Sequence, residues 1–261
     1  MRYRVLATDY DGTLANDGVT DDATVAAIER FRDAGGRLIL VTGRELPDLA
    51  GTFHRLDAFE RVVAENGGLL YDPASGTERM LAPSCDPVLP ELLRLRGVTP
   101  ISVGRTIVAT IQPHDMAVLE AIKELGLELQ IIFNKGAVMV LPSGVNKATG
   151  LAAALDELGS FAGDTVGIGD AENDHAFLEM CGLSVAVRNA IPALRARVRL
   201  VTAGARGQGV QELIDRLLRD DVVECCRRSD ADDTGPSRGI HISLLACSWL
   251  RGHSSAAGGW T

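Results

Sequence analysis

The strongest constraint on the fold is an alternation of short apolar runs with longer helical patterns in both halves of the chain. Such alternation is typical of parallel strands that are joined by crossover helices. Gly35-Gly36 ends the first helical pattern as a C-terminal cap would, and Asp21 lies at its start, where the helix dipole favours anions. The sequence therefore predicts an α/β fold with a doubly wound, Rossmann-like parallel sheet. We expect strands at 4–8, 37–41, 61–64, 165–168, 183–187 and 199–201, and helices at 21–34, 45–56, 147–158, 171–180 and 208–218, with a short helix before the last strand.

The middle of the chain has a different pattern, in which a helix is followed by two strands, twice. Its helices are expected at 86–95 and 114–125, and its hairpins turn at 103–105 and 134–136. This pattern predicts a small α+β cap domain inserted into the core. The expected division is a core of residues 1–81 and 144–220, a cap of residues 82–143, and a tail of residues 221–261 that is disordered or joins a missing segment.

Composition and charge exclude several classes of protein. The 261 residues carry a formal net charge of −9, which disfavours a nucleic-acid surface. No run approaches the ~20 apolar residues of a membrane span, and the N-terminus does not resemble a signal peptide. The five cysteines are scattered without metal spacing. We therefore expect a cytoplasmic protein that binds neither membrane nor nucleic acid and whose oligomeric state is open.

Two acidic clusters follow predicted strands. Asp9 and Asp11 of DYDGT lie two residues apart at a strand end, so both side chains leave an extended chain on the same side. In GDAEND, Asp170 follows another strand and Asp174 lies four residues further on, at a helix start. Oxygen ligands of this kind suit Mg²⁺, and open α/β sheets bind ligands at the carboxyl ends of their strands. The alternatives are an ordinary acidic turn for the first cluster and helix capping for the second.

Two further segments could bind an anion. Thr42 and Gly43 end the second strand and offer a hydroxyl and an unhindered N–H at a helix start. Lys147 begins another helix, where a cation is unfavourable unless an anion lies nearby. A plain turn and a solvated lysine remain the alternatives.

Read in order, DYDGT at 9–13, VTGR at 41–44, Lys147 and GDAEND at 169–174 resemble the four motifs of the haloacid dehalogenase superfamily phosphatases. The position of the cap is similar to the branch with an α+β cap inserted after the third strand, which includes Cof-type, sucrose-phosphate and archaeal phosphoglycolate phosphatases. The resemblance covers about residues 3–218. It implies a Mg²⁺-dependent phosphatase that hydrolyses a small phosphate monoester, phosphoglycolate or a sugar phosphate, through an aspartyl-phosphate intermediate.

The resemblance also implies roles for single residues. Asp9 would be the nucleophile and a Mg²⁺ ligand. Asp11 would be the general acid and would offer its backbone carbonyl to the metal, which Asp170 would also bind. The phosphate would be held by Thr42, Gly43, Lys147 and Asn173. Asp174 would keep these residues in place without contacting the phosphate itself.

Substrate selection is expected to involve the cap and its hinge. Arg44 is a candidate at the hinge, and Arg105, Asn134 and Lys135 are candidates at the cap hairpin turns, although solvated turns are an alternative for them. Two other functions stay open, a phosphomutase of the same superfamily and a non-catalytic regulatory module of a longer protein.

Overall fold

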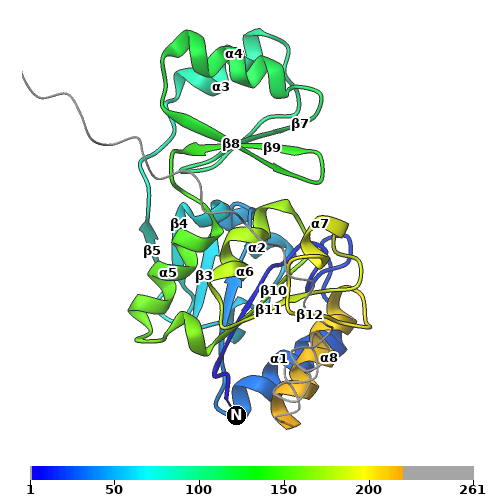
Figure 1. Ribbon diagram of the computed structural model, residues 1–261. Coiled ribbons are helices and arrows are strands. Elements are labelled where there is room, and N and C mark those ends of the chain that lie inside the picture. Colours follow the sequence, from blue (N-terminus) through cyan, green and yellow to red (C-terminus); the bar gives the residue numbers. More distant parts are fainter. Residues whose placement is uncertain (1, 220–261) are drawn as a thin grey trace, which may run out of the picture.

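The computed structural model describes residues 2–219, and the predicted tail lies outside the described residues. An eight-stranded sheet forms the lower body in Figure 1, and a four-stranded sheet forms the upper one. In spatial order the larger sheet consists of β12 (Leu200–Val201), β11 (Leu183–Ala186), β10 (Thr165–Gly169), β1 (Val5–Thr8), β2 (Arg37–Val41), β3 (Arg61–Ala64), β4 (Leu69–Asp72) and β5 (Thr77–Met80).

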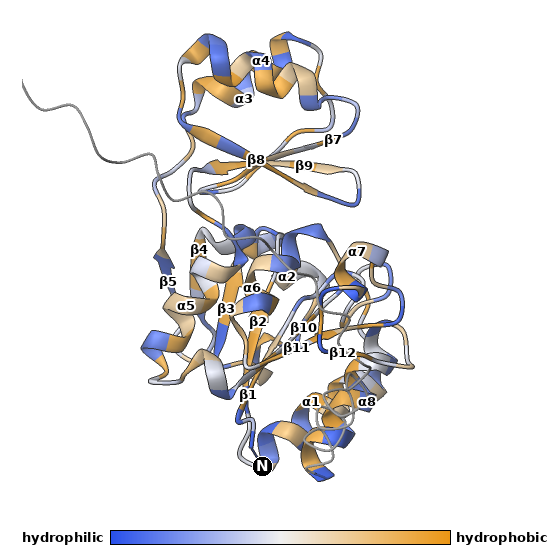
Figure 2. Cartoon of the chain, in the orientation of Figure 1, coloured by the Kyte–Doolittle hydropathy of each residue, from blue (hydrophilic) through white to orange (hydrophobic). Residues whose placement is uncertain are grey.

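The six strands from β12 to β3 are parallel, as the alternating sequence pattern predicts. The central strand β1 is buried along its whole length, because helices cover both faces of a parallel sheet. Figure 2 shows the resulting apolar band through the strands of this body. The helices are α1 (Asp22–Asp33), which packs against α8 (Arg206–Arg219), α5 (Lys147–Glu157), which packs against α6 (His175–Met180), and the short α2 (Leu46–Thr52) and α7 (Pro192–Arg195).

The core sheet is larger than predicted, because an antiparallel hairpin of β4 and β5 extends it beyond β3. All four residues of β5, Thr77–Met80, are exposed at the edge of the sheet. An edge strand with two open faces needs no apolar alternation, so the sequence pattern gave no signal for it.

Two helices have different ends in the structure from those predicted. The predicted helix 45–56 ends at Thr52, since the next residue, Phe53, has an extended backbone and packs its ring against Tyr10 and Phe59. The predicted helix 171–180 is a 3₁₀ turn, Glu172–Asp174, followed by α6. Further 3₁₀ turns lie at Leu56–Ala58, Glu65–Gly67 and Ala162–Asp164.

The upper body has the predicted order of helix, hairpin, helix, hairpin. Its elements are α3 (Val88–Leu95), β6 (Ser102–Val103), β7 (Val108–Ile111), α4 (Asp115–Leu125), β8 (Leu129–Asn134) and β9 (Ala137–Pro142). Both helices lie on the side of the small sheet away from the core (Figure 1), and they enclose a separate hydrophobic cluster that includes Leu89, Val118 and Val138. We call this body the cap. The separate sheet and hydrophobic cluster support the predicted division of the chain into a core and a cap of residues 82–143. We propose this division.

The strand order reverses between β1 and β10, since the chain builds outward from β1 to β3 on one side and from β10 to β12 on the other. Ligands of doubly wound sheets bind beyond the carboxyl ends of the strands at such a point. Asp9 and Asp170 are the residues that follow these two strands. None of the helices in the described part of the chain is long and apolar enough to cross a membrane.

The approach of α5 to the sheet yields a prediction about stability. A Cβ added at Gly150 would overlap the Val63 side chain and lie 2.8 Å from Gly67 Cα. We expect Gly150→Ala to lower the free energy of unfolding by about 1–3 kcal/mol, because the helix would have to move away from the sheet. Chemical denaturation measures the change.

Gly51 is the matched control, because it also lies in a helix but has open space around its Cα. Gly51→Ala should raise the free energy of unfolding by about 0.5–1 kcal/mol. Equal stability of the two variants would contradict close packing at Gly150.

Candidate active site

The polar residues singled out in the sequence lie together at the carboxyl edge of the core sheet. Asp9 follows β1 and Asp170 follows β10, and the N–H of Asp9 donates to the carbonyl of Ile168 at 3.0 Å. Thr42 follows the neighbouring strand β2, and Lys147 begins α5. The topology therefore gathers four segments that are far apart in the sequence.

Lys147 is the centre of this cluster. Its Nζ lies 2.5 Å from Asp9 Oδ1 and 2.6 Å from Asp174 Oδ1, and its side chain is only 1% exposed. Burial would lower the pKa of Lys147, but the charges of Asp174 and Asp9 outweigh burial and raise that pKa above its ordinary value. The lysine at this helix start is thus a buried cation between two carboxylates, and the alternative of a solvated lysine is excluded.

The carboxyl group of Asp9 is subject to opposing influences. Burial raises its pKa, the positive charge of Lys147 opposes the rise, and the charges of Asp174 and Asp170 add to it. Added positive charge at this site would stabilise the ionised form of Asp9.

Both carboxylate oxygens of Asp174 accept hydrogen bonds from the protein. Its Oδ2 accepts the backbone N–H groups of Asp170 and Ala171 at 2.7 and 2.9 Å, while its Oδ1 contacts Lys147. This carboxylate therefore fixes the turn after β10 and the position of the lysine.

Asp170 is completely buried and only partly satisfied. Its Oδ2 accepts from Lys135 Nζ of the cap and, at 3.3 Å, from Asn189 Nδ2. Its Oδ1 has no hydrogen-bond partner among residues 2–219. Burial raises the pKa of Asp170, and Lys135 opposes the rise.

The donor set fits a divalent cation. Carboxylate oxygens of Asp9, Asp170 and Asp174 lie within 4.8 Å of one another, and all three residues are buried. Because Asp174 is occupied by its own donors, Asp9 and Asp170 are the residues able to hold an ion. Buried carboxylates without a cation are costly, and oxygen ligands suit hard ions.

Gly12 lets the DYDGT loop lie close to Asp170. Its φ is +84°, and a Cβ there would overlap the Asp170 carboxylate and lie 2.7 Å from Lys135 Nζ. Its carbonyl accepts from Asn189 Nδ2 at 2.8 Å. Only glycine combines this backbone conformation with the close approach.

Thr42 follows β2, and Asn173 lies in the turn after β10, close to Gly43. Thr42 is buried and its Oγ1 accepts the N–H of Arg44 at 3.1 Å. Asn173 Nδ2 donates to Asn66 Oδ1 at 2.9 Å, and this leaves Asn66 Nδ2 without a partner in the described chain. Rotating both amides reverses the bond and makes Asn173 Nδ2 the free donor, so in either state the pair offers an unpartnered NH₂ group to a ligand.

The cap also lies close to Gly43. A Cβ at Gly43 would lie 3.3 Å from Met139 Sδ of β9 and 3.7 Å from Asn173 Nδ2. The core-facing side of the cap sheet therefore covers the predicted phosphate-binding segment directly.

Asp11 does not lie free beside Asp9. Arg44 holds it through two hydrogen bonds, from Nε to Oδ2 at 2.7 Å and from Nη2 to Oδ1 at 2.8 Å, and also contacts Asp48. The role predicted for Arg44, substrate selection at the hinge, is untested, and the contact observed is with the predicted general acid.

The predicted cap residues separate into two groups. Lys135, at the tip of the β8–β9 hairpin, reaches Asp170, and the neighbouring Asn134 has a buried Oδ1 without a partner in the described range. Arg105 does not join them, because its guanidinium pairs with Glu78 of β5 at 2.6 Å.

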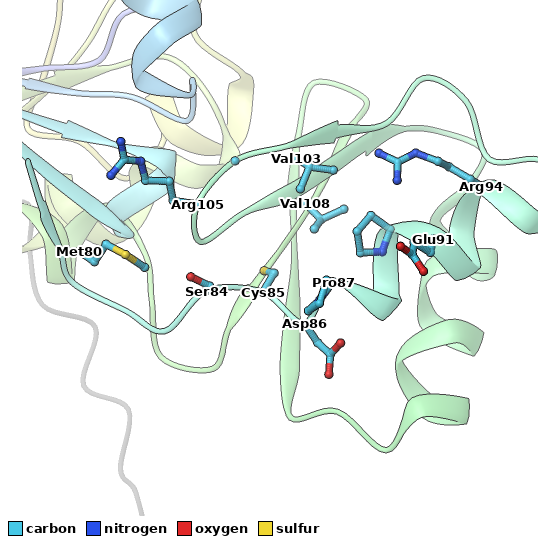
Figure 3. Close-up of a pocket in the computed structure, with 12 residues that line it drawn as sticks. Met80, Ser84, Cys85, Asp86, Pro87, Glu91, Arg94, Val103, Arg105 and Val108 are labelled. Carbon is cyan, nitrogen blue, oxygen red and sulfur yellow. The ribbon is translucent and has the colours of Figure 1, made fainter.

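Figure 3 shows Arg105 at a cavity of about 460 Å³ between the cap and the linker that follows β5. Its lining includes Met80, Cys85, Arg94 and Arg105, and none of the acidic cluster. This cavity is therefore separate from the acidic cluster at the carboxyl edge of the core sheet.

Two residues near the cluster received no catalytic or binding role from the sequence, although Asn66 was expected near the hinge between core and cap. Asn189 links the loops after β1 and β10, and Asn66 contacts Asn173. Both are asparagines in turns, where a capping role is so common that the sequence alone cannot mark them as functional.

Comparison with known proteins identifies the family. The model of the haloacid dehalogenase-like hydrolases matches residues 6–80 and 108–214. The chain is 32% identical over 226 residues to phosphoglycolate phosphatase of Methanothermobacter thermautotrophicus, covering 82% of this chain and 99% of the relative. It is 33% identical over 222 residues to that of Halorubrum lacusprofundi, covering 81% and 96%. The chain belongs to the haloacid dehalogenase-like hydrolases, and the enzyme class expected from the sequence, a phosphatase of this superfamily, is confirmed.

Solved structures show the same fold. A haloacid dehalogenase-like hydrolase from Bacteroides thetaiotaomicron has a TM-score of 0.68 at 21% identity, covering 82% of this chain and 99% of that one. A HAD/COF-like hydrolase from Plasmodium vivax has a TM-score of 0.72 at 19% identity, covering 84% and 96%.

The partly satisfied Asp170 yields a prediction about metal binding. We expect Asp170→Asn to weaken Mg²⁺ binding at least about 10-fold, because a neutral amide replaces a charged ligand. Titration calorimetry, or the rise in melting temperature with Mg²⁺, measures the affinity.

Glu172→Gln is the matched control, because Glu172 lies in the same turn but is exposed. It should keep the Mg²⁺ affinity of the unaltered protein. An Asp170→Asn protein that binds Mg²⁺ as tightly as the control would contradict the assignment.

Proposed function

We propose that this enzyme is a Mg²⁺-dependent phosphatase that hydrolyses a small, anionic phosphate monoester through an aspartyl-phosphate on Asp9. One observation carries the proposal. Asp9 lies buried at the end of β1, 2.5 Å from the cation of Lys147, with Asp170 at the end of the neighbouring strand. This arrangement supplies a nucleophile together with the positive charge that its reaction needs.

Metal binding would involve Asp9, Asp170 and the backbone carbonyl of Asp11. When bound, Mg²⁺ supplies positive charge that offsets the repulsion between a phosphate dianion and a carboxylate. The unpartnered Oδ1 of Asp170 supports this assignment.

The remaining positive charge and the hydrogen bonds come from the chain itself. Lys147 orients Asp9 and would contact a phosphoryl oxygen, and the hydroxyl of Thr42 and the N–H of Gly43 would hold others together with the Asn66–Asn173 pair. Such fixed donors stabilise the charge that develops on the transferring phosphoryl group. Attack by the Asp9 carboxylate would expel the alkoxide and leave an aspartyl-phosphate, which splits one difficult hydrolysis into two easier steps.

Asp11 would transfer the protons. As an acid it protonates the leaving alkoxide, and as a base it takes a proton from the water that attacks the aspartyl-phosphate. Arg44 holds both carboxylate oxygens of Asp11 in a bidentate pair, which would have to loosen for Asp11 to reach the leaving group.

The cap indicates the class of substrate. Met139 lies against Gly43, which leaves little depth for a leaving group, and Lys135 places an ammonium group at the site. With a metal ion held by Asp170, Lys135 would be available to an anionic group of the substrate. A short phosphorylated carboxylate such as phosphoglycolate, the substrate in the name of the relatives, matches both features. The cytoplasmic location stays a prediction.

Release of phosphate from phosphoglycolate, sugar phosphates and an aryl phosphate, with and without EDTA, tests the function. We expect EDTA to abolish activity and Asp9→Asn to lower kcat at least about 1,000-fold, because the nucleophile is lost. Asp48→Asn is the control, because Asp48 is a nearby aspartate that pairs with Arg44 but has an exposed side chain.

Three other outcomes would contradict the proposed function, each in a different way. Full activity in EDTA or in Asp9→Asn would refute the mechanism. Return of labelled phosphate to the substrate in place of release would identify a mutase, and a folded, Mg²⁺-loaded protein inactive on every ester would favour a regulatory module.

The role of Lys135 has its own test. We expect Lys135→Met to raise KM for phosphoglycolate about 10-fold or more, with little effect on an uncharged aryl leaving group, because a charged contact is lost. Lys123→Met, an exposed lysine on helix α4 of the cap, is the control. An equal effect on both esters would show that Lys135 does not contact the leaving group.

A further inference from the structure

The turn Glu65–Gly67 after β3 has an unusual backbone. Three consecutive residues have positive φ, 49° at Glu65, 54° at Asn66 and 107° at Gly67. Left-handed conformations are costly for residues other than glycine and persist where surrounding contacts hold them. The contacts of this turn therefore indicate what it is for.

The side chain of Glu65 is buried against the cap. Only 1% of Glu65 is exposed, and its carboxylate accepts the N–H of Arg105 at 3.0 Å and the N–H and hydroxyl of Thr106 at 2.7 and 2.9 Å. All three donors belong to the 104–107 loop of the first cap hairpin. A buried carboxylate needs such donors, and each bond to its charge is stronger than a neutral hydrogen bond.

The fit around this contact is close on both sides. A Cβ at Gly104 would lie 2.8 Å from the carboxyl carbon of Glu65, and a Cβ at Gly68 would overlap Thr106. The carbonyl of Thr106 also accepts the Sγ–H of Cys85 at 2.9 Å, from the linker that leads into the cap. Core, linker and cap loop thus meet at one buried point.

The same turn contacts the phosphate-binding segments on its other side. The N–H of Glu65 donates to the carbonyl of Arg44, and the N–H of Asn66 to the carbonyl of Thr42, both at 2.9 Å. The side chain of Asn66 contacts Asn173. Seating of the cap and placement of Thr42 and Asn173 are therefore set by adjacent residues of one strained turn.

Other contacts between cap and core are more accessible to water. Arg105 pairs with Glu78 where the two side chains are 54% and 29% exposed, and Lys135, whose side chain is 42% exposed, pairs with the fully buried Asp170. Exposed pairs contribute little, whereas breaking a buried one is costly.

We propose that Glu65 is a positioning residue, whose carboxylate seats the 104–107 loop on the core and thereby holds the cap in register with the phosphate-binding residues. The contacts alone carry the structural part of the proposal, that Glu65 seats the 104–107 loop. The kinetic part, that this seating affects substrate binding, rests on the proposed phosphatase function. Glu65 itself touches no predicted reacting group.

Hydrogen exchange tests the structural part. In Glu65→Gln the amides of Arg105 and Thr106 should exchange at least about 10-fold faster than in the unaltered protein, because the amide side chain cannot accept from all three donors. Glu78→Gln, which breaks the exposed pair to the same loop, should leave these amides unchanged. Exchange that is unaltered in a folded Glu65→Gln protein, or equally fast in both variants, would overturn the proposal.

Kinetics test the functional part. Glu65→Gln should lower kcat/KM for phosphoglycolate about 10-fold or more through KM, while kcat for a small aryl phosphate changes less than about 3-fold, since the catalytic groups of the core remain in place. If Glu65→Gln does not fold, Thr106→Val removes one of the three bonds and should show the same split, and Thr106→Ser should restore normal values.

The two proposals can fail separately. If the unaltered enzyme hydrolyses no ester, the phosphatase proposal fails and hydrogen exchange still decides the role of Glu65. If the enzyme is active but Glu65→Gln and Thr106→Val slow both esters equally, the coupling between cap seating and substrate binding is refuted.

Discussion

The buried ion pairs of Lys147 hold the catalytic edge of the protein together. Its ammonium group lies between Asp9 at the end of β1 and Asp174 in the turn after β10, and Asp174 in turn accepts two backbone N–H groups of that turn. Removing one partner would leave an uncompensated buried charge, which is far more costly than losing a surface pair. The same lysine therefore fixes the geometry of the site and keeps positive charge beside Asp9, the proposed nucleophile.

The cap completes this arrangement from above. Its sheet presents Met139 to Gly43 and Lys135 to Asp170, while its helices lie on the far side. Excluding water strengthens every electrostatic interaction within the site, and in the proposed mechanism the cap would have to open for release of product. The cap contacts the core through the buried carboxylate of Glu65 and through two pairs that water reaches in part, Arg105–Glu78 and Lys135–Asp170.

Sequence patterns predicted much of the fold and the membership of the site. Parallel strands, crossover helices and the doubled helix-hairpin unit follow from periodicity that burial imposes, and the structure has them. The edge hairpin of β4 and β5 was not predicted, because the outer strand β5 is exposed and carries no such periodicity. Among the candidate residues, Arg105 faces Glu78 and lies away from the acidic cluster, and a hairpin turn in a sequence does not reveal which way its side chains point.

The sequence by itself determined which chemical groups are available and at which strand ends they lie, because strand ends and residue types are local properties. Only the tertiary structure decided their pairing. That Arg44 holds Asp11, that Asn66 joins Asn173, and that Glu65 receives the cap loop are contacts between segments 33 to 107 residues apart in the chain. Such contacts depend on sheet order and on the seating of the cap, which arise from the packing of the whole chain.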